Sequence, residues 1–418
     1  MPIIQSRLDL DFYKLTMAQV ILRHYWDVRV PWAFANRTNG IVLPKHIRLA
    51  ELREELDYVR TLRPTGEELR YLREDPEIAR ILPGLFLTEF LAFFQNLQLP
   101  EVFTEVVPGS DGRDRLRIET EGTWREVTFW ETYILSILTE LYGRDLCERN
   151  GTSQWEIYRE GDRRLETKIA LLGDHPSVRF TEFGTRRRFS GPWQEHVLDR
   201  LLAEIPTQVV GTSNVMLAKY FGIAPVGTFA HEMFMVLYAR AKALGSLTPV
   251  ADAHDEVLRV WWGAYGEPLS IALTDTFGSE FFFSRFSREQ ALAWRGQRLD
   301  SGDPIEEGEK AIAFYERNNI NPQDKLLLPS DGLTAETMVT ITEHFAGRAR
   351  IAHGWGTNAT NDVGFAPLSL IVKAVAAEGH GTVKLSNNPA KAMGSAEDVE
   401  AVKREVGYAD RAAQPVVY

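Results

Sequence analysis

The sequence predicts an α/β fold, in which an incomplete TIM-like β/α barrel is accompanied by a second, α+β domain. Three observations predict it: the chain has 418 residues, its two regions follow different patterns, and the longer region repeats a unit of strand, turn and helix. At ~150 residues for a typical domain, this length favours two domains or one large barrel with an appendage. We expect the α+β domain at residues 1–135, joined by about 375–418, and the barrel at 136–374.

The composition is that of an acidic globular protein. Hydrophobic residues make up 44% of the chain and charged residues 25%, so the chain can bury a large core and is not disordered. The 47 lysines and arginines against 58 aspartates and glutamates leave a formal charge of -11, which repels nucleic acid and anionic membranes at long range. We therefore expect no nucleic-acid partner, and local groups must bind any anionic ligand.

Cysteine content and hydropathy indicate the cellular compartment of the protein. The single cysteine, Cys147, excludes an internal disulfide and a thiolate zinc site, which suits a reducing compartment. No stretch approaches the ~18 consecutive apolar residues of a membrane span. The opening MPIIQSRLDLD lacks the basic and apolar regions of a signal peptide. We expect a cytoplasmic protein with no membrane association.

The first region mixes helical and strand patterns. Asp9 and Asp11 are possible helix caps. The apolar residues after them recur at helical spacing: Leu15, Ala18, Ile21 and Leu22. Arg/Glu-rich sequence from about 45 to 80 is helical in pattern, and alternation of apolar and polar residues predicts strands at 32–34 and 116–120. These elements predict an α+β domain.

The second region, from about residue 167, repeats a short apolar run, a turn and an amphipathic helix. The seven turns read EFGTRRR, VGTSN, VGTFAHE, LTDTFGSE, RLDSGDP, PSDG and HGWGT. Such units imply a parallel sheet, and at this spacing they fit a barrel better than the alternative, a doubly wound sheet. The final segment, LSLIVKAVAAEGHGTVKLSNNPAKAMG, reads as a strand, a Gly-rich turn and a second strand that return to the first domain.

Several common motifs are absent from the sequence. There is no GxxxxGK[ST] and no GxGxxG, which excludes a P-loop and a dinucleotide fingerprint, and HEMFM does not match the zinc motif HExxH. The turns are instead rich in Gly, Thr, Ser, Arg and Asp, residues that bind phosphate oxygens, ribose hydroxyls and Mg²⁺. Because barrel enzymes carry their active sites on the loops after the strands, these turns are the expected site.

Each candidate residue in the turns also has an ordinary structural interpretation. Arg186 begins a basic triplet after a strand, which is typical of a solvated face or of an anion site. His231 starts a helix after VGTFA, where it is either a catalytic or a packing histidine. Tyr13 can be a packing residue alone. The aspartates can be ligands or only helix caps: Asp275, Asp300, Asp303 and Asp331.

Six strings occur in the order known from one enzyme family. They are LDLDFYKLTMAQ, FGTRRRFS, VGTSN, GTFAHE, RLDSGDP with the following EKAI, and GTVKLSNNPAK. Through them the chain resembles, over nearly its whole length, the nicotinate phosphoribosyltransferases, which are type II phosphoribosyltransferases. The resemblance implies an enzyme that forms nicotinate mononucleotide and pyrophosphate from nicotinate and phosphoribosyl pyrophosphate. This is the first step of NAD biosynthesis from nicotinate, and in the family it is coupled to ATP hydrolysis and uses Mg²⁺.

The resemblance also implies roles for single residues. His231 aligns with the histidine that ATP phosphorylates, a role that suits an imidazole that is neutral near pH 7. Nicotinate is expected to contact four residues: Tyr13, Phe183, Thr228 and Arg298. The phosphoribosyl and phosphate groups are expected at a second set: Arg186, Ser213, Asn214, Asp275, Asp303, Asp331, Gly354, Gly356 and Thr357. Mg²⁺ is expected to accompany the phosphates, with no direct protein ligand assigned.

In the family, the tyrosine that aligns with Tyr13 reaches the site from a neighbouring subunit. The resemblance therefore implies a homodimer with shared active sites. Two positions depart from the family pattern: Asn358, which follows GWGT, and Gly332 in PSDGL. They affect the expected phosphate contacts and leave the aligned histidine and arginine in place.

Three other functions stay open on the sequence. Nicotinamide phosphoribosyltransferases carry an acid where this chain has Asn214, and that acid would repel a substrate carboxylate, so Asn214 favours nicotinate. Another phosphosugar-binding barrel enzyme, such as an aldolase or isomerase, is the second, but no lysine in the turns stands out for a Schiff base. The third is a non-catalytic nucleotide sensor, against which His231, Arg298 and Thr228 argue.

Overall fold

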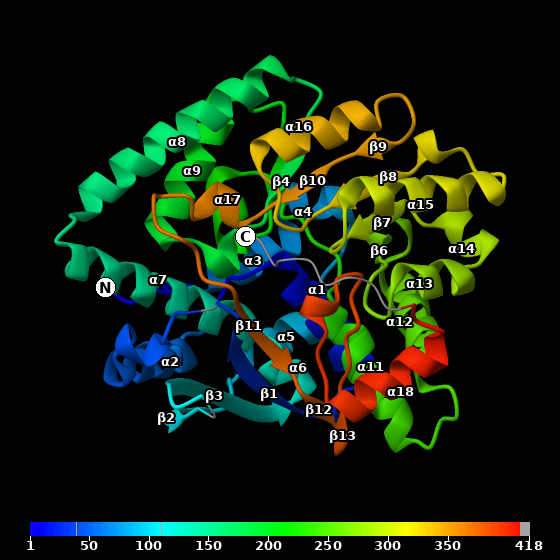
Figure 1. Ribbon diagram of the computed structural model, residues 1–418, viewed down its shortest axis with the longest axis horizontal. Coiled ribbons are helices and arrows are strands. Elements are labelled where there is room, and N and C mark those ends of the chain that lie inside the picture. The colour runs from blue at the N-terminus through cyan, green and yellow to red at the C-terminus, as the bar shows by residue number, and fades with distance from the viewer. Residues whose placement is uncertain (39, 110, 410–418) are drawn as a thin grey trace.

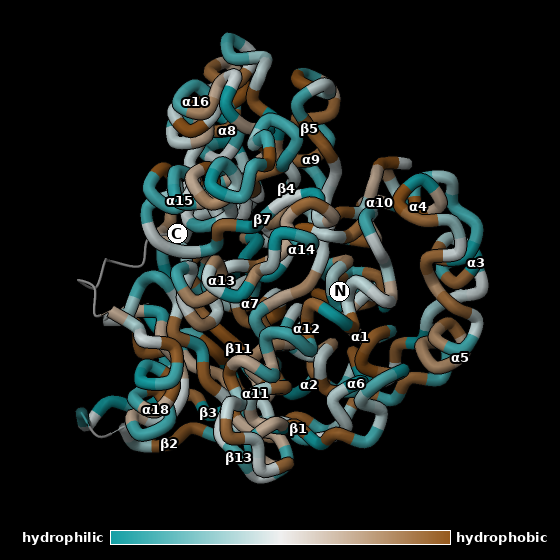
Figure 2. Tube along the Cα trace, turned by 90° about the vertical axis from the view of Figure 1, so that its right-hand side faces the viewer, coloured by the Kyte–Doolittle hydropathy of each residue, from teal (hydrophilic) through white to brown (hydrophobic). Residues whose placement is uncertain are grey.

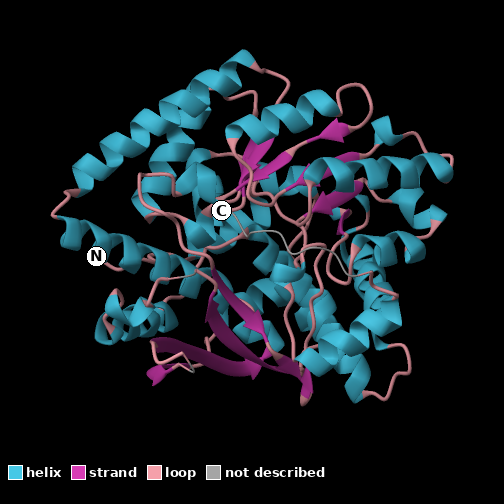
Figure 3. Cartoon of the chain, in the orientation of Figure 1, coloured by secondary structure: helices cyan, strands magenta, loops and turns pink. Residues whose placement is uncertain are grey.

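The computed structural model describes residues 1–38, 40–109 and 111–409. It shows an antiparallel sheet and a set of parallel strands, with helices packed around both (Figures 1 and 3). In Figure 2, brown apolar stretches follow β1 and β11, whereas the outer helix α3 is largely teal. None of the described helices combines the length and apolar character that crossing a membrane requires.

The antiparallel sheet is the base of the first domain, and its strand order is β11-β1-β3-β2 (Figure 1). Its strands are β1 (Arg29–Asn36), β2 (Val102–Pro108), β3 (Asp114–Thr123) and β11 (Leu370–Ala374). β1 and β3 confirm the strands predicted at 32–34 and 116–120. β11 pairs with β1, with Ala374 opposite Trp32. The chain therefore returns to this sheet after the barrel.

Helix α1 (Phe12–His24) confirms the predicted N-terminal helix. Asp11 stands at its N-cap position but makes no capping bond, because its carboxylate accepts a hydrogen bond from Ser213 Oγ at 2.7 Å. The helical pattern at 45–80 corresponds to α2 (Leu49–Thr61), α3 (Gly66–Glu74) and α4 (Pro76–Ile81). Two further helices complete this region, α5 (Thr88–Asn96) and α6 (Trp124–Val127).

Helix α7 (Trp130–Asn150) connects the two domains. Every side chain from Trp130 to Gly143 is buried, which means that this half of the helix is covered on all sides. The domain boundary that we predicted near residue 135 falls inside this helix. Helix α8 (Gln154–Asp174) follows, and its start is set by a capping box between Ser153 and Glu156.

The parallel strands lie in two sheets, β10-β4-β5 and β6-β7-β8-β9. The strands are β4 (Phe180–Glu182), β5 (Val209–Thr212), β6 (Ile271–Leu273), β7 (Gly296–Leu299), β8 (Leu326–Pro329), β9 (Arg350–Ile351) and β10 (His353–Trp355). Residues 350–355 join the sheets, because Ala352 N donates to Leu327 O at 3.2 Å and His353 N donates to Arg179 O at 2.9 Å. The last strand thus pairs with the first, as in a barrel and unlike a doubly wound sheet.

The barrel is incomplete between β5 and β6. The repeat predicts a strand that ends at Ile223, before the turn VGTFAHE, but no strand forms within residues 213–270, all of which the structure describes. A single bridge between Thr212 and Pro225 takes its place. Proline has no N–H to donate to a strand ladder, so the pairing cannot extend through Pro225.

Helices pack around the outside of the barrel strands (Figure 3). They are α9 (Gly191–Glu204), α10 (Val215–Phe221), α13 (Ser279–Arg285), α14 (Arg288–Ala293), α15 (Pro304–Arg317), α16 (Ala335–His344) and α17 (Thr357–Thr360). Helix α11 (His231–Ala243) packs instead against α12 (Pro249–Tyr265) and β11. β11 confirms the first strand predicted in the C-terminal segment, and the short hairpin of β12 (Ala376–Ala377) and β13 (His380–Gly381) forms at the Gly-rich turn. The second predicted strand, after this turn, does not form: residues 382–388 make only an isolated bridge between Lys384 and Met393. Helix α18 (Ala396–Val406) is the last described element, and the described part of the chain ends at residue 409.

A buried ion pair ties the N-terminal segment to the barrel. Both Nη atoms of Arg188 donate to the carboxylate of Asp9 at 2.7 Å, and the two side chains are 1% and 3% exposed. We expect Asp9→Asn to lower the free energy of unfolding by about 3–5 kcal/mol, because it leaves the Arg188 charge buried without a counterion. Urea denaturation measures this loss.

A matched control uses an exposed pair of the same chain. Arg29 and Glu121 are 62% and 56% exposed, and Glu121→Gln should cost about 0–1 kcal/mol. Equal losses in the two variants would contradict a special role for the Asp9–Arg188 pair.

Candidate active site

Two adjoining cavities lie at the carboxyl ends of the barrel strands. They share four wall residues: Tyr13, Phe183, Arg186 and Arg298. The first, which we call the polar cavity, is also lined by His231, Asp300 and Ser330. The second, the barrel cavity, has a volume of about 410 Å³ and reaches between the strands as far as Ile271 and Leu326. A volume of this size suits a small organic ligand.

The structure brings most of the predicted site residues to these cavities, although they are far apart in the sequence. Those that line them are Tyr13, Phe183, Arg186, Ser213, Thr228, His231, Arg298, Asp331, Gly356 and Thr357. Asp275 lies directly behind one of them, with Oδ1 at 3.7 Å from His231 Nε2. The carboxyl ends of parallel strands meet at one end of a barrel, which explains this convergence.

Two predicted phosphate ligands lie elsewhere. Asp303 is exposed and caps α15, where its carboxylate accepts hydrogen bonds from the N–H groups of Ile305 and Glu306 at 2.9 Å. Asn214 is buried and caps α10, and its amide donates to Asp9 at 2.8 Å. The predicted cap interpretation therefore holds for Asp303, and Asn214 is a helix cap that the sequence did not predict. The argument that Asn214 distinguishes nicotinate from nicotinamide fails, because its neighbour Ser213 lines the cavity instead.

Gly354 has no side chain, and this leaves room for the ring of Phe183 at the site. A Cβ atom at this position in β10 would lie 2.6 Å from Cδ2 of Phe183 and 2.9 Å from Cβ of Ser330. The backbone N–H of Phe183 donates to Trp355 O at 2.8 Å, which holds the aromatic residue beside β10. Glycine therefore makes room for the ring, and the structure gives Gly354 this role in place of the predicted phosphate contact.

Tyr13 lies in the cavity of its own chain. Its ring centroid is 5.4 Å from the guanidinium carbon of Arg186, and its hydroxyl donates to Glu131 at 3.0 Å. The close approach of Gly227, where a Cβ would lie 3.0 Å from Tyr13 N, fixes the start of α1 against the loop that precedes His231. Within one chain, Tyr13 therefore lines the site of its own subunit, and the entry of a tyrosine from a neighbouring subunit stays a prediction.

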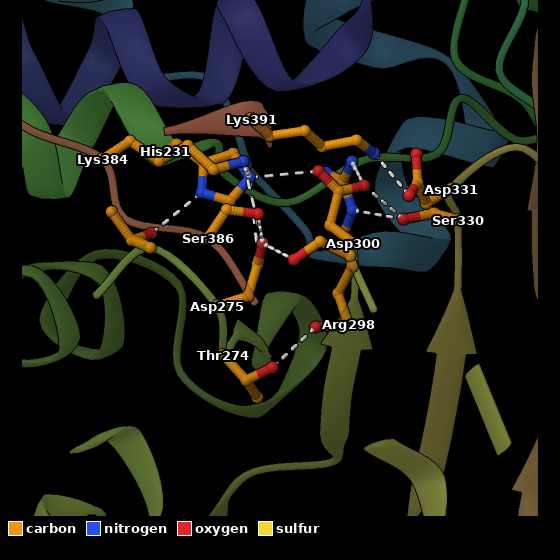
Figure 4. Close-up of polar contacts among 12 residues, drawn as sticks. His231, Thr274, Asp275, Arg298, Asp300, Ser330, Asp331, Lys384, Ser386 and Lys391 are labelled. Atoms are coloured by element: carbon orange, nitrogen blue, oxygen red, sulfur yellow. Dashed lines mark hydrogen bonds and ion pairs between the residues drawn. The ribbon is translucent and has the colours of Figure 1, made fainter. Parts of the chain in front are cut away.

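His231 begins helix α11 and is surrounded by polar groups (Figure 4). Its Nδ1 lies 2.9 Å from Thr276 Oγ1, and its Nε2 lies 3.0 Å from Asp300 Oδ2 and 2.8 Å from Lys384 Nζ. Burial and the charge of Lys384 lower the pKa of His231 to about 4, against the opposing effect of Asp275 and Asp300. The imidazole is therefore neutral near pH 7 and keeps a lone pair for reaction.

Asp300 connects this histidine to Arg298 (Figure 4). Its Oδ1 accepts hydrogen bonds from Arg298 Nη2 and from Ser330 Oγ, both at 2.7 Å. Burial by itself would raise the pKa of Asp300, but Arg298, His231 and Lys384 together hold it well below its usual range. The sequence indicated Asp300 only as a ligand or a helix cap, without a predicted role in the site.

Three lysines without a predicted role also line the polar cavity. They are Lys373 on β11, Lys384 and Lys391. Lys373 Nζ lies 2.7 Å from Glu131, and Lys391 pairs with Asp331. The string GTVKLSNNPAK contains two of the lysines, so the motif itself was a signal for them. Lys373 carries no local signal, because only the return of β11 to the first sheet brings it to the cavity.

The environment of His231 predicts its titration. We expect the imidazole to stay neutral until the pH falls to about 4, and Lys384→Met to raise this pKa, because Asp275 and Asp300 then act without an opposing charge. Because the pKa in the unfolded chain is the ordinary 6.5, the stability that neutral His231 contributes is full above that pH and declines as the pH falls toward 4. NMR titration of labelled histidines measures the pKa, and a midpoint near 6.5 would contradict the prediction.

Comparison with known proteins places the chain in a family. The model of the nicotinate phosphoribosyltransferase (NAPRTase) family matches residues 178–410, and that of the family's N-terminal domain matches 8–139. A crystal structure of nicotinate phosphoribosyltransferase from Vibrio cholerae is 32% identical, with a TM-score of 0.85 over 98% of this chain and 95% of that one. One from Porphyromonas gingivalis is 28% identical, with a TM-score of 0.84 over 97% and 100%. The chain therefore belongs to the nicotinate phosphoribosyltransferase family.

Proposed function

We propose that the protein forms nicotinate mononucleotide and pyrophosphate from nicotinate and phosphoribosyl pyrophosphate, with ATP hydrolysis coupled through a phosphohistidine at His231. Family membership supports the enzyme class, the two substrates and a place in NAD biosynthesis. One observation carries the rest: Asp300 contacts both His231 and Arg298, at 3.0 and 2.7 Å. It puts a neutral phosphoryl acceptor and a carboxylate-binding arginine in the same cavity.

Nicotinate fits where the two cavities meet. Arg298 offers a planar guanidinium for the carboxylate, and the rings of Phe183 and Tyr13 can pack against the pyridine. The guanidinium carbon of Arg298 lies 6.0 Å from the ring centroid of Phe183, so charge and aromatic surface are side by side. Thr228, which also lines the barrel cavity, supplies a polar group at the same end.

The phosphoribosyl pyrophosphate lies in the polar cavity in this proposal. Arg186 and the three lysines provide positive charge for its phosphates, and Thr357 provides a hydroxyl. The pyridine nitrogen attacks the anomeric carbon with its own lone pair while the bond to pyrophosphate breaks, so no general base is needed. The fixed cations stabilise the charge that develops on the leaving pyrophosphate.

Mg²⁺ has suitable oxygen ligands beside the histidine. Oxygen atoms of Asp275 and Asp300 lie with a nitrogen of His231 within 4.8 Å of one another. Asp275 Oδ1 is buried and has no hydrogen-bond partner in the described part of the chain, which fits a carboxylate that meets a cation. When bound there, Mg²⁺ would neutralise phosphate charge.

In the coupled reaction, a nitrogen lone pair of His231 attacks the terminal phosphorus of ATP and ADP leaves. Water later hydrolyses the phosphohistidine and releases inorganic phosphate. Lys384, whose Nζ lies 2.8 Å from Nε2, is placed to balance the charge of the added phosphoryl group. The neutral imidazole is the form that this step needs.

We also propose a homodimer in the cytoplasm. The resemblance to the family supports the dimer, in which a tyrosine shared between subunits stays a prediction. A half-buried free thiol at Cys147 is compatible with a reducing compartment. Sedimentation velocity of the purified protein tests the assembly state.

The substrate choice can be tested directly. Purified protein with Mg²⁺ and phosphoribosyl pyrophosphate should form mononucleotide from nicotinate in preference to nicotinamide, because the positive charge of Arg298 favours a carboxylate over a neutral amide. ATP should stimulate the reaction. Parallel assays with each base, with and without ATP, measure this. Product from nicotinamide alone would indicate the amide-using enzyme, and no product from either base would contradict the proposed reaction.

The role of His231 has its own test. We expect His231→Ala to abolish both the ATP stimulation and phosphoryl transfer from radiolabelled ATP to the protein, while slow ATP-independent formation of nicotinate mononucleotide continues. The reason is that the pyridine nitrogen reacts without help from the histidine. His254→Ala is the matched control, because His254 is equally buried but lines neither cavity. Undiminished ATP stimulation in His231→Ala would overturn the assignment.

A further inference from the structure

We propose that Ser330 is a positioning residue for nicotinate: it fixes one edge of the Arg298 guanidinium so that the other edge meets the substrate carboxylate. This inference rests on the proposed function and concerns the same site. It assigns a role to a residue that lies outside the six strings of the family resemblance.

The backbone around Ser330 is held by the strand that carries Arg298. Ser330 directly follows β8, and β7 and β8 are parallel neighbours in which Arg298 pairs with Leu328. The N–H of Ser330 donates to Leu299 O at 3.0 Å, which continues the ladder by one residue. The position of the serine relative to the arginine is therefore set by the sheet and not by a mobile loop.

The side chain of Ser330 closes a triangle of hydrogen bonds (Figure 4). Arg298 Nε donates to Ser330 Oγ at 2.9 Å, and Ser330 Oγ donates to Asp300 Oδ1 at 2.7 Å. Arg298 Nη2 donates to the same Oδ1 at 2.7 Å. A hydroxyl can accept one hydrogen bond and donate another at once, which is what this position requires.

The triangle determines which guanidinium donors remain for a ligand. Nε and one N–H of Nη2 lie along the same edge of the group, and Ser330 and Asp300 occupy that edge. No other side-chain hydrogen bond of Arg298 occurs among the residues that the structure describes, so Nη1 and the second N–H of Nη2 form the remaining edge. Two parallel N–H groups match the two oxygens of a carboxylate.

The neutrality of Ser330 is also important. One oxygen of Asp300 already offsets part of the positive charge of Arg298, and its other oxygen contacts His231. A second acid at position 330 would make this side of the cavity negative and repel nicotinate. A hydroxyl fixes the arginine without changing the net charge.

Without the hydroxyl, the arginine loses its anchor at Nε while Asp300 keeps its contact with His231. Binding of the nicotinate carboxylate should therefore weaken, while phosphorylation of His231 continues. A serine that contacts the other carboxylate beside His231 provides the matched control. Ser301 Oγ donates to Asp275, and within the described part of the chain the side-chain hydrogen bonds of Arg298 go to Ser330 and Asp300 instead.

The experiment compares Ser330→Ala and Ser301→Ala with the wild-type enzyme, with nicotinate varied at saturating phosphoribosyl pyrophosphate, ATP and Mg²⁺. Three quantities are measured: the KM for nicotinate, the inhibition constant of 3-methylpyridine, which keeps the ring and lacks the carboxylate, and labelling of His231 by radioactive ATP. For Ser330→Ala we expect the KM to rise roughly tenfold or more, with the inhibition constant and the labelling retained. For Ser301→Ala we expect reduced labelling and a retained KM.

An unchanged KM in Ser330→Ala would overturn the inference, as would a parallel rise in the KM and the 3-methylpyridine constant, which indicates a general loss of structure. Should Ser330→Ala be unstable, Ser330→Gly supplies the same comparison. A double-mutant cycle adds an independent check: in the Arg298→Lys background, which lacks Nε, removing the hydroxyl should leave the KM where it is. Inactivity of the wild-type enzyme on nicotinate would instead overturn the proposed function.

Discussion

Charged side chains at the start of α1 are buried between the two domains, and the site depends on them. Asp9 pairs with Arg188, Asp11 lies 3.1 Å from Arg186 Nε, and Lys14 lies 2.8 Å from Glu131 on α7. Burying ions is costly unless each has a partner at good geometry. These pairs therefore favour one arrangement of the N-terminal segment against the barrel, the one in which Tyr13 stands beside Arg186.

The same pairing principle shapes the electrostatics of the cavity. The chain carries a formal charge of -11, yet Lys373, Lys384 and Lys391 gather at the polar cavity. Carboxylates such as Glu131 pair with these lysines. Lys14, Lys373 and Arg186 keep the pKa of Glu131 well below its usual range, although burial by itself would raise it. Fixed cations of this kind can stabilise a departing pyrophosphate without reorganising during the reaction.

Local patterns were enough to identify most of the fold. Apolar periodicity indicated α1, alternation indicated β1 and β3, and the repeated turns indicated the parallel barrel strands, because period and turn chemistry follow from neighbouring residues. The strand expected at Ile223 did not form, since Pro225 cannot extend a ladder and this edge of the barrel stays open. The helix that crosses the expected domain boundary, α7, is buried by both domains, and no local signal shows such packing.

For the site, residue types in the turns predicted phosphate binding, and the resemblance of six strings to the nicotinate phosphoribosyltransferases implied the roles of His231 and Arg298. Local sequence could not distinguish a ligand from a cap, since Asp300 and Asp303 occur in the same turn and differ only in where their carboxylates point. Nor could it show that Lys373 reaches the cavity from a strand of the other domain, or that Ser330 meets Arg298. Such contacts join residues far apart in the chain, so they follow from strand register and packing, which arise only when the whole chain has folded.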